Sequence, residues 1–316
     1  MRNNGNLLVN SCHVKVTLFL SVLCLSAVLA LGQDTNQKPI SLYATNGVTH
    51  QSSACFEDYL ILVSKYVSKI SLYNLKSRKL LCVKELQPWT ELRGKTDIYH
   101  ANNCSFGSQK YKDSDLFPLL YVSHRENNEK RGVLQVFRVV PMKTQKYKDD
   151  YDSLSISLVQ TIYYPEMTDK NALGSPWTVI DIDNNCMYTY SRNNRGKSVN
   201  RGMCRVSKFK IPAARESREI FLNENDILES YEVSFKAPLS QGACIHKGRM
   251  YIAQGVSPKK YLWLRVIDLK NKKLLRTIDL KKAGLSSEPE GCFVYDNQLM
   301  ISTASKTIFK VNIPLE

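Results

Sequence analysis

The sequence predicts an all-β protein built from five repeated units of short strands. Apolar and polar residues alternate over short segments that polar turns separate, which is the pattern of half-buried strands. One motif, a small or polar residue followed by a cysteine and an apolar strand, recurs along the chain. The last unit lacks one strand, and an unassigned strand precedes the first unit. Together these observations predict a ring that the two chain ends close.

The longest internal match is between two predicted hairpins. Residues 70–86 read "ISLYNLKSRKLLCVKEL" and residues 264–280 read "LRVIDLKNKKLLRTIDL". Each is an alternating strand, a Lys-rich polar turn and a second strand that begins with "KLL". Period-2 alternation around a short polar turn is typical of a β-hairpin.

A second motif opens each unit upstream of its hairpin. Its copies are "SSACFEDYLILVSK" (52–65), "ANNCSFG" with "PLLYVSHR" (101–125), "SPWTVIDIDNNCMYTYSR" (175–192), "QGACIHKGRMYIAQ" (241–254) and "PEGCFVYDNQLMISTAS" (289–305). In four copies a cysteine holds the same place, namely Cys55, Cys104, Cys244 and Cys292, and Val179 stands there in the third. Four symmetric repeats indicate packing cysteines, because a catalytic nucleophile or metal ligand would not recur in every unit.

Each unit divides into four predicted strands. They are 54–56, 60–64, 69–75 and 80–86; 103–106, 119–124, 133–139 and 154–163; 177–182, 186–191, 203–210 and a ragged strand within 219–233; and 243–246, 250–254, 262–269 and 274–280. The fifth unit supplies only three. We expect residues 39–46 to provide its missing strand.

Radially repeated four-stranded units, with one terminus completing the sheet begun by the other, resemble a five-bladed β-propeller. The resemblance covers the mature chain and rests on architecture, since no signature of a characterised family is present. It is similar to exported bacterial propeller proteins of uncharacterised function. The propeller resemblance implies that the segments in which small or polar residues precede the repeated cysteine are the innermost strands of the blades. Counts of four or six blades remain alternatives, because residues 166–200 and the insertions at 109–115 and 125–131 blur the unit borders.

Residues 1–32 have the pattern of a secretory signal peptide. Arg2 and Lys15 flank an apolar run at residues 16–32, where Ala30 and Gly32 suit a cleavage site. We therefore expect export to the periplasm, the cell surface or the medium, and a single domain over residues 33–316. A single membrane anchor is the alternative, although the run is shorter than the roughly 20 residues of a spanning helix.

The mature chain is basic and holds seven cysteines. Removing Arg2 and Lys15 lowers the formal net charge from +15 to +13, which favours anionic surfaces as partners. The lysines and arginines cluster in predicted hairpin tips, at Lys76, Arg78, Lys79, Lys270, Lys272 and Lys273. No nucleic-acid module is recognisable, and we expect a monomer. An odd cysteine count cannot form a complete disulfide framework.

Polar residues concentrate in the segments that lead into the innermost strands. They are His50, Gln51, His100, Asn102, Asn103, Trp177, Gln241, Glu288 and Glu290. In a propeller these segments converge on one mouth of the central channel, where a few polar groups and an aromatic ring suit a small ligand. We expect binding of a glycan or another small polar ligand, with Trp177 stacking on a sugar face. The alternative interpretation is that these side chains satisfy backbone groups and channel waters.

Other functions remain open. His50, His100 and Glu290 or Glu288 would come from adjacent blades and form a donor set for a divalent cation. A glycan hydrolase or lyase would use Glu290 or Glu288 as acid or base, with His100 or a bound cation assisting. Asp97 is the only carboxylate close to another entry segment that could act as the second one. A protein-interaction scaffold would use the Lys-rich rim. The sequence contains no phosphate loop and no nucleophile elbow.

Overall fold

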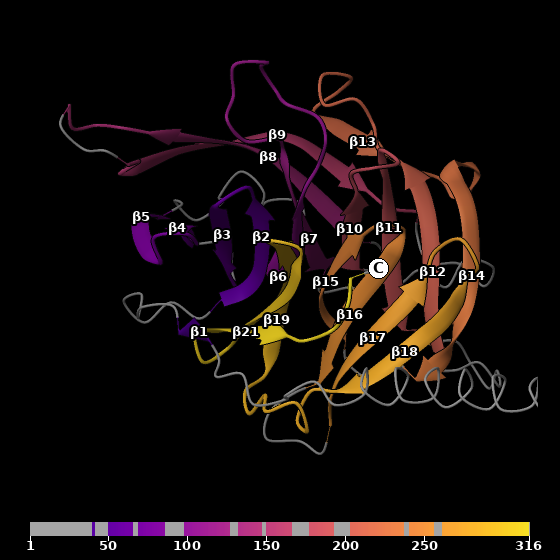
Figure 1. Ribbon diagram of the computed structural model, residues 1–316. Coiled ribbons are helices and arrows are strands. Elements are labelled where there is room, and N and C mark those ends of the chain that lie inside the picture. The colour runs from indigo at the N-terminus through magenta and orange to yellow at the C-terminus, as the bar shows by residue number, and fades with distance from the viewer. Residues whose placement is uncertain are drawn as a thin grey trace, which may run out of the picture. The chain divides into compact units, whose positions relative to one another are not determined.

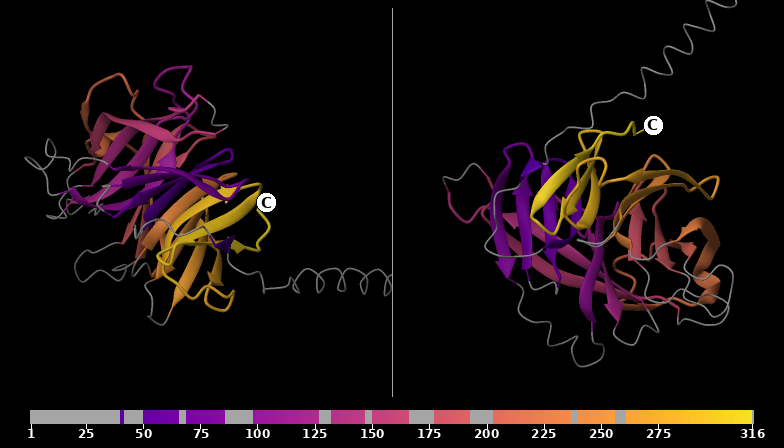
Figure 2. Two further views of the ribbon diagram at one scale, coloured as in Figure 1. Left: turned by 90° about the vertical axis from the view of Figure 1, so that its left-hand side faces the viewer. Right: turned by 90° about the horizontal axis from the view of Figure 1, so that it is seen from below.

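Five antiparallel sheets surround a common axis in the computed structural model (Figures 1 and 2). The chain divides into two compact units, residues 1–37 and Lys38–Glu316, and the described residues all belong to the second. They are residues 40–41, 50–65, 69–85, 98–126, 132–146, 150–165, 177–192, 203–236, 240–255 and 261–315. Within them no helix is long and apolar enough to cross a membrane. The predicted signal segment lies outside the described residues.

The sheets are the blades of a five-bladed β-propeller, which confirms the predicted fold class. Blade 1 contains β2 (His50–Phe56), β3 (Tyr59–Ser64), β4 (Lys69–Asn74) and β5 (Lys79–Glu85). Blade 2 contains β6 (Ile98–Phe106), β7 (Leu120–Glu126), β8 (Val133–Met142) and β9 (Ser153–Tyr163). Blade 3 contains β10 (Trp177–Asp181), β11 (Cys186–Arg192), β12 (Met203–Lys210) and β14 (Ile227–Lys236), and blade 4 contains β15 (Ser240–His246), β16 (Arg249–Gly255), β17 (Leu262–Asp268) and β18 (Lys273–Asp279).

Blade 5 is completed by the N-terminal strand. It contains β19 (Pro289–Tyr295), β20 (Gln298–Thr303), β21 (Thr307–Val311) and β1 (Ile40–Ser41). Ile40 pairs with Ile308 and Ser41 with Thr307 in an antiparallel ladder, and β1 lies beside β21 in Figure 1. The prediction that both chain ends share one blade is therefore confirmed. Of the predicted segment 39–46, residues 39 and 42–46 lie outside the described residues.

The ragged strand predicted within residues 219–233 proves to be two strands. β13 (Glu219–Phe221) pairs in parallel with β9 and adds a fifth strand to blade 2. After a single 3-10 turn at Glu224–Asp226, β14 forms the outer strand of blade 3. The placement of β13 was missed because its partner lies in another blade and no alternation within three residues reveals it. The stacked rings of Tyr163 and Phe221, with centroids 4.6 Å apart, stabilise the pair.

Three innermost strands start earlier than predicted, whereas β10 starts at Trp177 as predicted. β2 begins at His50 rather than residue 54, β6 at Ile98 rather than 103, and β15 at Ser240 rather than 243. The polar residues there pair with the second strand of their blade, as His50 does with Ser64. Buried backbone groups need such partners whatever the side chain, so polar composition alone was a poor guide to the start of each strand.

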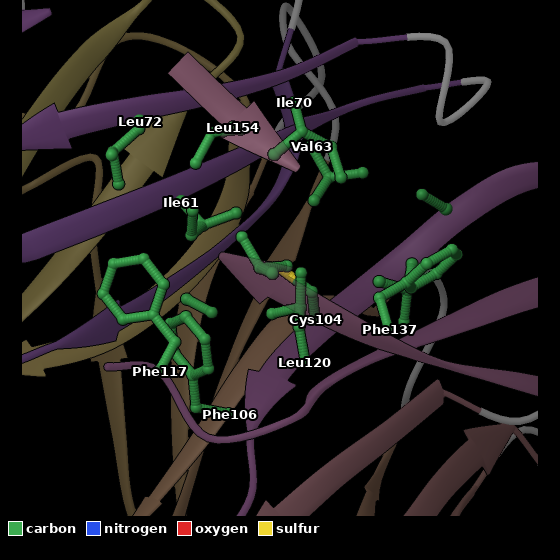
Figure 3. Packing of buried hydrophobic residues seen from close by; sticks show 14 residues of the cluster. Ile61, Val63, Ile70, Leu72, Cys104, Phe106, Phe117, Leu120, Phe137 and Leu154 are labelled. Atoms are coloured by element: carbon green, nitrogen blue, oxygen red, sulfur yellow. The ribbon is translucent and has the colours of Figure 1, made fainter. Parts of the chain in front are cut away.

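Apolar side chains pack between neighbouring blades. Figure 3 shows one such layer, in which residues of blade 1, including Ile61, Val63 and Leu72, meet residues of blade 2, including Phe106 and Leu120. All are buried. Alternate residues of each strand face opposite neighbours, so each blade contributes to two such layers.

The innermost strands approach one another so closely that only small residues fit. A Cβ added to Gly242 would lie 2.5 Å from Cα of Gly291, and one added to Gly291 would lie 2.0 Å from Oγ of Ser53. Ser53 itself accepts a 2.9 Å hydrogen bond from Ser302. Blades 4, 5 and 1 are therefore in contact through backbone and hydroxyl groups beside the axis.

Substitution of Gly291 by alanine tests this contact. The added methyl group has no space, so we expect the free energy of unfolding to fall by about 3 kcal/mol. Gly248→Ala is the matched control, because nothing lies within 4 Å of its Cβ position and only its positive φ of 72° is unfavourable; its cost should be about 1 kcal/mol. Urea unfolding of both variants measures the difference. Equal losses would contradict the crowded axis.

Candidate functional site

Five polar side chains gather where the innermost strands begin, and we call this group the polar mouth. Its members are His50 and Gln51 of β2, Gln241 of β15, Glu288 immediately before β19, and Glu290 of β19. All except the half-buried Glu288 are buried. They come from blades 1, 4 and 5, so ring closure brings together residues about 240 positions apart in the sequence.

Two amide–carboxyl hydrogen bonds hold the polar mouth together. Nε2 of Gln51 donates to Oε2 of Glu290 at 2.5 Å, which joins blade 1 to blade 5. Nε2 of Gln241 donates to Oε1 of Glu288 at 2.7 Å, which joins blade 4 to blade 5. Each carboxyl group of blade 5 thus accepts a hydrogen bond from a neighbouring blade, Glu290 from blade 1 and Glu288 from blade 4. Hydrogen-bond donors and acceptors therefore alternate along one edge of the channel.

Blade 3 extends this arrangement with aromatic rings. The hydroxyl of Tyr190 donates to the backbone oxygen of Gln241 at 2.6 Å. The half-buried ring of Trp177 stacks on Tyr190, with centroids 5.9 Å apart and planes 18° apart. The sequence does not predict Tyr190 as a site residue, because Tyr190 belongs to the second strand of its blade, whereas the predicted site residues come from segments that lead into first strands. Its one sequence signal is its position in an alternating apolar strand, which does not distinguish a polar contact from core packing.

Glu290 is a neutral acid at physiological pH. Burial raises the pKa of its carboxyl to about 9, and the negative charge of Glu288 adds to this rise while Lys65 opposes it. Only 6% of the residue is exposed to solvent. A protonated carboxyl can accept from Gln51 and still offer an O–H donor, so Glu290 can both give and receive a hydrogen bond.

His50 is a neutral base in the same region. Burial lowers the pKa of its imidazole to about 4, and the charge of Lys306 adds to the effect. Only 3% of the residue is exposed, yet neither ring nitrogen has a hydrogen-bond partner among the described residues. An unpaired buried polar group is unfavourable by about 1–3 kcal/mol. A bound water or ligand that pairs with this ring would remove that penalty.

Asn103 has a different place from the one expected for a ligand-binding residue. Its Nδ2 donates to the backbone oxygens of Thr178 at 2.7 Å and Ala243 at 3.2 Å, and its Oδ1 accepts from the Ala243 amide at 3.1 Å. The side chain of blade 2 therefore spans to blades 3 and 4. Its amide is thus engaged with backbone groups of those two blades.

Two further predicted residues, Asn102 and His100, belong to the first half of β6. Asn102 is buried in β6. His100 also belongs to β6, but its side chain lies outside the described residues, as does Asp97. Among the described residues, no group of three or more His, Cys, Asp or Glu could hold a metal ion. The divalent-cation site with His50, His100 and Glu290 thus stays a prediction.

No protein-family model matches the sequence, and neither does any curated protein. Among solved structures, the chain is similar to Myxococcus xanthus glutaminyl cyclase, with a TM-score of 0.45 and 12% identity over 87% of this chain and 92% of that one. It is also similar to a luciferin-regenerating enzyme, with a TM-score of 0.39 and 8% identity over 87% of this chain and 80% of that one. At these values the comparisons assign no residue a function. The class that the fold itself defines is the five-bladed β-propeller.

Replacement of Glu290 by glutamine tests the buried neutral carboxyl. Between pH 4.5 and about 9 the folded protein keeps a proton that the unfolded chain has released, so stability falls as pH rises through this window. The free energy of unfolding of the wild type, relative to Glu290→Gln, should fall by about 1 kcal/mol per pH unit. Urea titrations at several pH values measure this difference. A difference that does not change with pH would show that Glu290 is ionised in the folded protein.

Proposed function

We propose that the protein binds a small uncharged polyhydroxylated ligand, such as a sugar unit of a glycan, at the polar mouth. The proposal rests on the hydrogen bonds that Gln51 and Gln241 donate to the two carboxyls of blade 5. These bonds fix the positions of donors and acceptors from three blades. Preorganised groups of this kind lose little conformational entropy when a ligand binds.

The electrostatics favour a ligand without net charge. Glu290 and His50 are both neutral at physiological pH, so the two buried titratable groups of the polar mouth offer hydrogen bonds without an ionic partner. Hydroxyl groups both donate and accept, and they match this mixture of amide, carboxyl and imidazole. The half-buried ring of Trp177 supplies an apolar surface of the kind on which a sugar face can pack.

A glycan array followed by calorimetry tests the proposal. Glu290→Gln keeps a neutral hydrogen-bonding group, so its Kd should stay within a few-fold of the wild-type value. Glu290→Leu removes that group and leaves Gln51 without its acceptor, so its Kd should rise about tenfold or more. Glu216→Gln, at an exposed site outside the polar mouth, is the control for an acid-to-amide substitution elsewhere on the protein and should leave the Kd unchanged. Absence of any glycan binding, or equal affinity of the wild type and Glu290→Leu, would refute the proposal.

One observation favours a second candidate, a glycan hydrolase or lyase at the same place. Glu290 holds a proton at neutral pH, as a general acid must. Glycoside hydrolysis also needs a second carboxyl across the scissile bond, whereas Glu288 and Glu290 belong to the same blade. Hydrolysis of an array ligand that falls about 100-fold or more in Glu290→Gln would establish this activity. Binding without turnover would eliminate it.

A further inference from the structure

A second feature of the channel lies beyond Asn103, at the end where the innermost strands finish. It is a cavity of about 240 Å³ lined by all five innermost strands, and we call it the thiol cavity. Its lining includes the four repeated cysteines, Cys55, Cys104, Cys244 and Cys292, together with apolar side chains and His246. The predicted ring of cysteines around the axis is therefore confirmed. No residue of the polar mouth lines the thiol cavity.

Two of these thiols are in contact across a blade boundary. Sγ of Cys244 in blade 4 lies 3.5 Å from Sγ of Cys292 in blade 5. Both cysteines are unpaired. A disulfide has a sulfur–sulfur distance of about 2.05 Å, so bond formation requires the sulfurs to approach by about 1.5 Å, which is within the reach of small side-chain rotations.

The backbone supports such a bond. Just upstream of the two cysteines, the Cβ position of Gly242 lies 2.5 Å from Cα of Gly291 and 3.0 Å from the backbone nitrogen of Cys292. β15 and β19 therefore approach closely without sharing a ladder. Disulfides join Cα atoms roughly 4.4–6.8 Å apart, and strands in backbone contact can meet this requirement without moving apart or together.

We infer that Cys244 and Cys292 are a redox-active pair that a hydroperoxide oxidises to a disulfide between blades 4 and 5. In the first step the Cys244 thiolate attacks one oxygen of hydrogen peroxide, the O–O bond breaks, and hydroxide leaves to take up a proton as water. The product is a sulfenic acid on Cys244. Cys292 then attacks that sulfur, the S–O bond breaks, and a second water leaves. Two thiols and one peroxide thus yield one disulfide and two waters.

Access and reactivity determine the order of attack. Both cysteines line the cavity, but Cys244 is only partly buried, whereas Cys292 is 1% exposed. Burial among apolar groups raises the pKa of Cys244 well above its ordinary value, and contact with Cys292 adds to the rise. Little thiolate therefore exists at neutral pH, and oxidation should be slow compared with that of a peroxide-scavenging cysteine.

Peptide mapping of the intact folded protein tests the inference. The protein is treated with hydrogen peroxide, its free thiols are alkylated, and tryptic peptides are analysed without reduction. Cys244 lies in peptide 237–247 and Cys292 in peptide 283–306, and neither peptide contains another cysteine. We expect a linked pair that is lighter by two hydrogen atoms than the sum of the two peptides. The link spans 48 residues, so it should also raise Tm by about 5 °C, reversibly on reduction.

Variants and controls make the result decisive. Cys104→Ser removes a thiol of the same cavity and should leave the link unchanged. Cys292→Ser should abolish it and leave a sulfenic acid on Cys244 that dimedone traps. If peroxide-treated, folded wild-type protein keeps both thiols free, links either cysteine elsewhere, or forms this link only in urea, the inference is overturned. The wild-type result alone decides, even if a variant fails to fold.

Discussion

The close approach of the innermost strands is the constraint on which the rest of the structure depends. Gly242, Gly291 and Ser53 bring three blades together at distances that no larger side chain would permit. This contact explains why the repeated motif begins with small residues. It also fixes the spacing of the residues on either side of it along the strands. Upstream, Gln51 reaches Glu290, and downstream, the sulfurs of Cys244 and Cys292 touch.

Asn103 adds a second contact among the innermost strands, between blades 2, 3 and 4. Its amide is hydrogen-bonded to backbone groups of Thr178 and Ala243, so one side chain ties three blades together where no ladder joins them. Such a fully satisfied buried amide specifies one arrangement of the blades, because any displacement leaves polar groups unpaired. The polar mouth lies at the start of the innermost strands and the thiol cavity farther along them, and the two have different chemistry.

The repeat, the completion of blade 5 by the N-terminal strand and the ring of cysteines could be predicted from the sequence, because each is a local pattern or a consequence of closing a ring. The start of β2 could not, since His50 and Gln51 are buried by tertiary contacts and not by their own polarity. β13 was missed because its parallel partner belongs to another blade. The sequence predicts Gln51, Gln241 and both glutamates as candidate ligand-binding residues, but their pairing depends on side-chain geometry that spacing does not encode.

Side-chain and backbone contacts beside the axis hold the blades in place, and Asn103→Asp disrupts one set of them. This substitution keeps the shape of the side chain but replaces two donated hydrogen bonds with a carboxylate facing backbone oxygens. Asn297→Asp makes the same chemical change in an exposed turn. Measured by urea unfolding at neutral pH, Asn103→Asp should lose about 3 kcal/mol or more and Asn297→Asp at most about 0.5 kcal/mol. Equal stability of the two variants would show that the hydrogen bonds of Asn103 do not hold the blades in place.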